Sequence, residues 1–312
     1  MDYASYSNLQ ACISLKTDSS NFDLWPFRNG YDFQEEVDRI DKYLPKSRES
    51  NIYASFMNLK ALFSQHFANY VRAFKYYDEA LRIWPNSSIQ KNKENCINDY
   101  ERYLFEFNNL KDWEIDKLDN YLNSLDDKKS NEYASLLNIR GLIFVKRGQY
   151  AESIEYFNKA LKIWPDNEQF LINKKECLYD WANYLFHDLE EYRQATEKIN
   201  EYLAICENRY DDDYYDAFRF RNKILYDWAV KLFISNEYDE SFKMVNDILL
   251  INEDEKNIDY AVTSNLKACI FDRWGQYDEA IKCYDEALKI DPDNPGIINN
   301  RQKTMEKLNN LR

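Results

Sequence analysis

The stretch Gly148–Asn167, which reads GQYAESIEYFNKALKIWPDN, decides the fold of this chain. It has a Gly-Gln-Tyr start, small and aromatic residues at fixed intervals, an Ala-Leu pair and a proline near its end. The same spacing returns without gaps at Asn69–Asn86 and at Gly275–Asn294. A pattern that returns at fixed spacing indicates a repeat architecture, in which each unit buries its apolar face against the next unit.

Together with the residues before it, each stretch completes a unit that resembles the tetratricopeptide repeat, a helix-turn-helix unit of about 34 residues. The resemblance implies a small residue where the first helix crosses the second, a small residue facing it, a packing aromatic, another small residue and a helix-ending proline. Small side chains are needed because the crossing helices come into close contact. In order, these positions fall on Ala61, Gly141 and Ala268; Ala73, Ser153 and Ala280; Tyr77, Phe157 and Tyr284; Ala80, Ala160 and Ala287; and Pro85, Pro165 and Pro292.

The composition favours an all-α fold. Glycine and proline number only five and six in 312 residues, which leaves little turn chemistry for a β-rich chain. No apolar run approaches about 18 residues, and the N-terminus lacks the basic start of a secretion signal, so we expect a cytoplasmic protein. The six cysteines form no Cys-x-x-Cys pair and there are two histidines, so neither a metal site nor a cofactor is predicted.

The repeats extend over the whole chain. Residues 51–85 and 131–165 are identical at 13 of 35 positions, which suggests that an 80-residue block of two repeats was duplicated. We therefore predict a single right-handed α-solenoid over residues 1–312, with about seven helical pairs and a closing helix. Its predicted parts are an interrupted first pair at 1–50 with an insertion at 17–31, two blocks at 51–130 and 131–210, a divergent repeat at 211–260, a regular repeat at 261–294 and the closing helix at 295–312.

A recurring asparagine occurs in the first helices, which usually supply the ligand contacts in the tetratricopeptide family. Asn58, Asn138 and Asn265 stand three residues before the small crossing position, and Asn8 and Asn98 are candidates for the same role. An amide side chain offers both donors and an acceptor, so a row of amides can bind an extended peptide backbone. The alternative is that each asparagine only bonds across to the neighbouring helix.

Two tryptophans, Trp84 and Trp164, stand directly before the helix-ending proline, where Asp291 occurs in the last regular unit. Both precede a divergent repeat. The favoured interpretation is that each indole packs on the longer helix that follows, and the alternative is an exposed aromatic contact for a partner.

Acidic residues outnumber basic ones by 14, and this charge opposes binding to nucleic acid or to anionic membranes. We expect a protein or peptide partner that is neutral or basic. The acidic clusters Asp211–Asp213 and Glu253–Glu255 are interpreted as solvated loop charges. The sequence contains no phosphate-binding glycine loop, nucleophile elbow or kinase signature.

The sequence therefore predicts a non-enzymatic scaffold that binds a protein or peptide on the concave face of a repeat superhelix. One alternative is a structural assembly factor that joins a larger complex through its aromatic, acidic outer surface. A more remote alternative is an enzyme with unrecognised carboxylate chemistry.

Overall fold

The computed structural model describes residues 37, 40–42, 44–106, 112–206, 212–251 and 257–311. These residues form thirteen helices and no strand, which confirms the predicted all-α class of stacked helix pairs. The chain divides into two compact units, Met1–Asn173 and Lys174–Arg312, and each is described by itself. No helix within the described ranges is long and apolar enough to cross a membrane.

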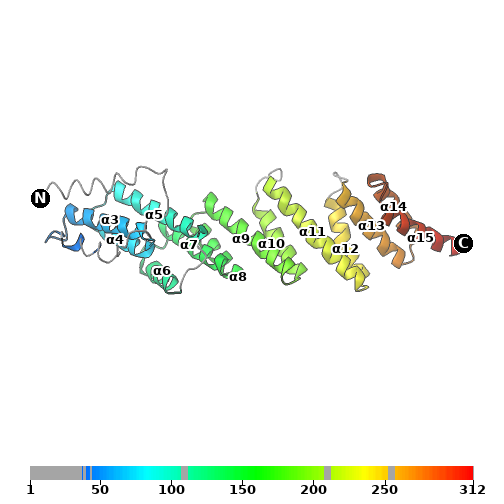
Figure 1. Cartoon of the computed structure of the whole chain (residues 1–312), viewed down its shortest axis with the longest axis horizontal. Helices are drawn as coiled ribbons and strands as arrows, with labels where there is room; N and C mark the ends of the chain where they lie inside the picture. The colour runs from blue at the N-terminus through cyan, green and yellow to red at the C-terminus, as the bar shows by residue number, and fades with distance from the viewer. Residues whose placement is uncertain are drawn as a thin grey trace, which may run out of the picture. The chain divides into compact units, whose positions relative to one another are not determined.

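The first unit contains three helix pairs and the first part of the next helix, α9 (Glu168–His187). The two helices of a regular repeat pack along their length, and α4 packs in turn on α5 (Figure 1). In chain order the pairs are α3 (Asn51–His66) with α4 (Tyr70–Ile83), α5 (Ser87–Glu106) with α6 (Asp112–Ser124), and α7 (Asn131–Lys146) with α8 (Tyr150–Ile163).

The second unit continues α9 and ends on α15, which packs against α14 as the last helix (Figure 1). The described residues hold six pairs and this closing helix. The expected seventh pair and the insertion at 17–31 fall on residues 1–50, most of which lie outside the described ranges, and the single solenoid over 1–312 stays a prediction. The helices that follow α9 are α10 (Tyr192–Ile205), α11 (Asp212–Ile234), α12 (Tyr238–Ile251), α13 (Ile258–Arg273), α14 (Tyr277–Ile290) and α15 (Pro295–Leu311).

Local chemistry sets where the regular repeats begin and turn. The side-chain oxygens of Ser50, Ser130 and Asn257 each accept a hydrogen bond from the backbone N–H three residues later, which caps the first helix of a repeat. The turn into the second helix requires a left-handed backbone, which glycine adopts without steric cost. Gly148 (φ 69°) and Gly275 (φ 76°) occupy this turn in two of the repeats.

The core of each regular repeat lies where its two helices cross. All twelve of the small and aromatic residues predicted for this crossing are buried. The approach is tight at Gly141, where an added Cβ would lie 2.6 Å from Cε1 of Phe157. Ser153 donates its Oγ–H to the carbonyl of Gly141 at 2.9 Å, and a divergent repeat makes the same bond from Ser241 to the carbonyl of Ala229 at 2.7 Å. The divergent repeat therefore keeps the crossing geometry of the regular ones.

The 80-residue spacing is also visible in the helix boundaries. The helices α7 and α8 begin and end 80 residues after α3 and α4. Ala80 and Ala160, which correspond in this spacing, are both fully buried.

Candidate functional site

Each of the three predicted asparagines accepts a hydrogen bond from another asparagine on a helix that follows its own repeat. In every case the Nδ2 atom of the later residue donates to the Oδ1 atom of the earlier one. The structure thus contains the bond between neighbouring helices that the sequence left open as the alternative. The pairs are Asn92 to Asn58 (3.2 Å), Asn173 to Asn138 (3.0 Å) and Asn300 to Asn265 (3.2 Å).

Asn138 is the most enclosed of the three, with 0% of its surface exposed. Its Nδ2 atom donates to the Glu101 carboxylate and its Oδ1 atom accepts from Asn173, so both ends of the amide are occupied. This corrects the expectation that Asn138 faces an open groove, because a fully buried side chain offers no surface to a peptide. Asn58 and Asn265 are half-buried, and their contact with a peptide stays a prediction.

The two remaining asparagine candidates differ in what the structure says of them. Asn98 is exposed on α5. Asn8 lies outside the described residues. Peptide binding by either side chain stays a prediction.

The Glu101 carboxyl, which accepts the hydrogen bond from Asn138, links this cluster to pH. Burial raises the pKa of the Glu101 carboxyl from its ordinary 4.5 to about 7, while the hydrogen bond from Asn138 acts in the opposite direction. A carboxyl whose folded pKa lies above its unfolded value binds more protons in the folded state. The free energy of unfolding therefore falls as the pH rises from about 4.5 to 7 and is lowest above that range.

We expect Glu101→Gln to raise the free energy of unfolding by about 1–3 kcal/mol at pH 8 and to change it little at pH 4.5. Glutamine is neutral at both pH values, and its Oε1 atom can still accept the hydrogen bond from Asn138. Urea unfolding at both pH values measures the difference, with the exposed Glu106→Gln on the same helix as the control. A gain of equal size at pH 4.5 and pH 8 would contradict the assignment.

The two predicted tryptophans lie just after the ends of α4 and α8, and both are half-buried. The indole of Trp164 meets the ring of Phe170 on α9 edge-on, with the ring centroids 5.8 Å apart. Trp164 thus packs on the helix that follows it. A contact of Trp84 or Trp164 with a partner stays a prediction.

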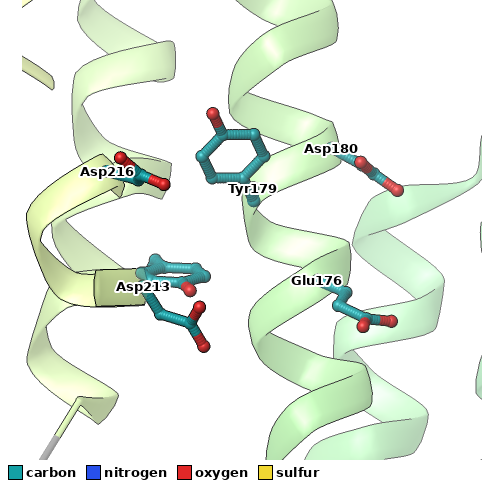
Figure 2. A pocket seen from close by; sticks show the side chains of 6 residues that line it. Glu176, Tyr179, Asp180, Asp213 and Asp216 are labelled. Carbon is teal, nitrogen blue, oxygen red and sulfur yellow. The ribbon is translucent and has the colours of Figure 1, made fainter. Parts of the chain in front are cut away.

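A hollow of about 320 Å³ lies between α9, α10 and α11 of the second unit. Figure 2 shows Asp216 extending from α11 toward the ring of Tyr179, with Asp213 one turn away on α11 and its carboxylate turned from that ring. Glu176 and Asp180 lie one turn apart on α9 and project from the side of this helix away from Tyr179 in this view. This spacing places each pair of carboxylates on one side of its helix. The hollow is lined by four carboxylates and two phenol rings, from Glu176, Tyr179, Asp180, Tyr202, Asp213 and Asp216.

The acidic groups of this hollow disfavour one another's negative charge. Partial desolvation raises the pKa of Glu176, the charges of Asp180 and Asp213 raise it further, and Lys175 lowers it. Burial and the nearby anionic groups also raise the pKa of Tyr202 to about 12. A cation near the hollow relieves this repulsion, and the Lys175 ammonium already lies 5.8 Å from the centroid of the Tyr202 ring.

The carboxylates of the hollow supply negative charge and are not arranged as metal ligands. Within the described ranges, no group of three or more His, Cys, Asp and Glu side chains could hold a metal ion. Carboxylates that are exposed beside aromatic rings can instead attract the ammonium of a lysine or the guanidinium of an arginine.

Sequence reasoning did not predict this hollow. Asp213 belongs to an acidic cluster interpreted as loop charge, yet it lies in the first turn of α11. Glu176 and Asp180 precede it by about a full repeat. The spacing of Glu176, Tyr179 and Asp180 could have predicted two carboxylates near a ring on one helix. It could not have predicted that residues of α10 and α11 complete the lining of the hollow.

Two stretches of the chain, residues 134–167 and 261–294, match the profile of the tetratricopeptide repeat. They coincide with the pairs α7–α8 and α13–α14, whose crossing residues are buried as the resemblance implied. The chain contains tetratricopeptide repeats. Repeats of this family generally form protein-interaction scaffolds, and the fold supports this class of function.

Several known proteins with such repeats are similar to this chain. The TPR repeat-containing protein MJ1428 of Methanocaldococcus jannaschii is 26% identical over 288 residues, which cover 79% of this chain and 47% of that protein. The chain thus spans about half the length of this relative. Among solved structures, the TPR2AB domain of yeast Sti1 in a pHSP90 complex is 13% identical, with 82% of this chain and 100% of that chain covered and a TM-score of 0.34. YrrB, a TPR protein with an unusual peptide-binding site, is 15% identical, with coverages of 87% and 98% and a TM-score of 0.27.

Proposed function

We propose that this chain is a non-enzymatic scaffold that binds a basic segment of a partner protein in the hollow between α9 and α11. The observation that carries the proposal is that four carboxylates and two tyrosine rings line one hollow. The proposed function assigns binding to these side chains and no chemical step.

A lysine or arginine side chain is complementary to such a hollow. Its charged end can meet a carboxylate of α9 or α11, while its apolar stem lies along the ring of Tyr179 or Tyr202. One exposed ion pair contributes only about 0.2–1 kcal/mol, so a useful affinity requires that several carboxylates act on one basic segment. The net charge of −14 adds a long-range attraction that speeds the encounter with a basic partner.

The test is the affinity of the full chain for a fluorescently labelled peptide, Ac-Gly-Lys-Arg-Lys-Gly-amide, measured by anisotropy. We expect the double substitution D213N/D216N to weaken binding about 5- to 30-fold, because it removes two ion pairs from the hollow. Binding of the wild-type chain should also weaken as the salt concentration rises, because counterions screen exposed charges.

The matched control is E152Q/D166N, which makes the same change in net charge at two exposed positions of the first unit. It should leave the affinity within about twofold, since neither side chain lines the hollow. An equal loss in both double variants would show that binding follows net charge alone. Equal binding of a Glu-Asp-Glu peptide would also contradict the proposed function.

A further inference from the structure

The second unit contains another hollow, of about 330 Å³, between α12, α13 and α14. Two polar side chains from α13, Ser264 and Lys267, line it together with Asn246 of α12 and Cys283 of α14. This hollow shares no lining residue with the one between α9 and α11, so a ligand bound here is independent of the proposed function.

The first unit contains the same arrangement of helices 127 residues earlier. The helices α6, α7 and α8 end at Ser124, Lys146 and Ile163, and α12, α13 and α14 end 127 residues later at Ile251, Arg273 and Ile290. Each residue of the hollow therefore has a counterpart in the first unit. The counterparts of Asn246, Ser264, Lys267 and Cys283 are Asp119, Leu137, Arg140 and Tyr156.

In the first unit this place is filled and its charges are paired. Leu137 is buried. The guanidinium of Arg140 donates from Nε and Nη2 to the two carboxylate oxygens of Asp119, at 2.7 and 2.9 Å, and lies 5.7 Å from the centroid of the Tyr156 ring. A bidentate pair of this kind is the favoured geometry between a guanidinium and a carboxylate.

In the second unit the same place has lost both its bulk and its anion. Serine replaces leucine at 264 and cysteine replaces tyrosine at 283, so volume is removed. The Ser264 side chain is 2% exposed, and its Oγ atom finds no hydrogen-bond partner among the described residues. Lys267 keeps the positive charge, yet it makes no ion pair with a described residue, because the amide of Asn246 stands where the first unit has a carboxylate. Its ammonium lies 5.5 Å from the ring of Phe242.

We propose that this hollow binds a carboxylate group, which takes the role that Asp119 plays in the first unit. The Oγ–H of Ser264 and the Nδ2–H of Asn246 donate hydrogen bonds to the carboxylate, and the ammonium of Lys267 neutralises its charge. The buried hydroxyl gains the partner that it lacks, which is the physical reason for binding at this position.

One carboxylate of the chain, Glu286, also lines this hollow. Its side chain is exposed, and its counterpart Lys159 pairs with Glu155 at 3.8 Å on the outside of α8. The charge of Glu286 is therefore in contact with water at the rim, where its repulsion of a bound carboxylate is screened.

The ligand can be the acidic side chain of a partner protein or a small free carboxylate. Two probes separate these sources: N-acetyl-aspartate N-methylamide and sodium acetate, each at up to about 100 mM, with sodium chloride at equal ionic strength as the reference. We expect the melting temperature of the full chain to rise by about 2–4 °C, as for a ligand present at several times its dissociation constant. If the capped aspartate raises the melting temperature at a tenfold lower concentration than acetate does, the ligand is a protein side chain. If the two probes raise it equally at equal concentration, the ligand is a free carboxylate. Both results support the assignment.

Two substitutions return the hollow to its counterpart in the first unit. N246D supplies an internal carboxylate for Lys267, and S264L supplies the missing volume. Both variants should fold, because the first unit holds these residues at the same place, and N246D alone should raise the melting temperature without ligand. Neither should respond to the probes, whereas K282M, at an exposed position of α14, should respond like the wild type.

The response of D213N/D216N should also equal that of the wild type, which separates this hollow from the proposed basic-segment site. No rise in the wild type beyond that in chloride, or an undiminished rise in both N246D and S264L, would overturn the assignment. A rise that appears only in E253Q/D254N/E255Q would overturn it as well, since the chain's own carboxylates would then be the occupants.

Discussion

Replacement of Lys93 by methionine is expected to lower the free energy of unfolding of the first unit by about 2–4 kcal/mol, because it removes a buried cation from two partly exposed carboxylates. Lys93 of α5 is 4% exposed and pairs with Asp78 of α4 and with Glu132 of α7, the latter at 2.5 Å. The Tyr121 hydroxyl of α6 lies 2.7 Å from Asp78 and 3.1 Å from Glu132. Side chains of four helices thus meet in this cluster, and methionine leaves the two carboxylates without the Lys93 ammonium.

Urea unfolding of the full chain measures this loss, and Lys91→Met is the matched control. Lys91 is exposed on the same helix, so its replacement should change the stability by less than about 0.5 kcal/mol. The triple variant K93M/D78N/E132Q should recover part of the loss, because it removes the uncompensated charges together with the cation. If K93M unfolds within about 1 kcal/mol of the wild type, this ion pair does not stabilise the junction of the four helices.

Replacement of Phe157 by alanine is expected to cost about 3–5 kcal/mol, the range for removing a fully buried aromatic ring. Phe157 is 0% exposed and stands against Gly141, where the two helices of the repeat cross. The cavity lies at a crossing held by backbone contact, so neighbouring side chains have little freedom to fill it. Thermal or urea unfolding measures the loss, with the exposed Lys159→Ala on the same helix as the control.

The same contact predicts how Gly141 and Phe157 are coupled. In the wild-type chain, Gly141→Ala places a methyl group 2.6 Å from the Phe157 ring and should cost about 1–3 kcal/mol. In the F157A background the ring is gone, and alanine is the better helix former by about 1 kcal/mol, so the same change should become neutral or stabilising. A double-mutant cycle tests this reversal of sign. An equal cost in both backgrounds would show that glycine is needed at 141 for another reason.

The helix pairs and their crossings could be predicted from the sequence because they depend on local spacing. The positions of Gly141, Ser153 and Phe157 follow from the helical period and from the size of the side chains that meet at a crossing, and all three are buried as expected. The glycine and asparagine residues at the turns and caps are equally local, since each acts on backbone groups within a few residues of itself.

The partners of the polar side chains could not be predicted in the same way. Asn138 is an amide on a first helix in either interpretation, but its burial depends on Glu101, 37 residues earlier, and on Asn173, 35 residues later. The acidic hollow likewise needs α9 and α11 to lie side by side. Such contacts join residues a full repeat apart, so helical periodicity alone does not specify them.

The two hollows and the filled place in the first unit show what the stacking of repeats decides. Leu137 and Ser264 occupy the same position in their helices, α7 and α13. In both cases the helical pattern of the sequence turns the side chain into the protein. Whether that place is filled and its charges are neutralised depends on the residue that an adjacent helix brings to it, which is Asp119 in one unit and Asn246 in the other. The sequence by itself therefore determined the scaffold, because helix packing follows local period and size, while the tertiary structure decided where unpaired charge and open volume coincide.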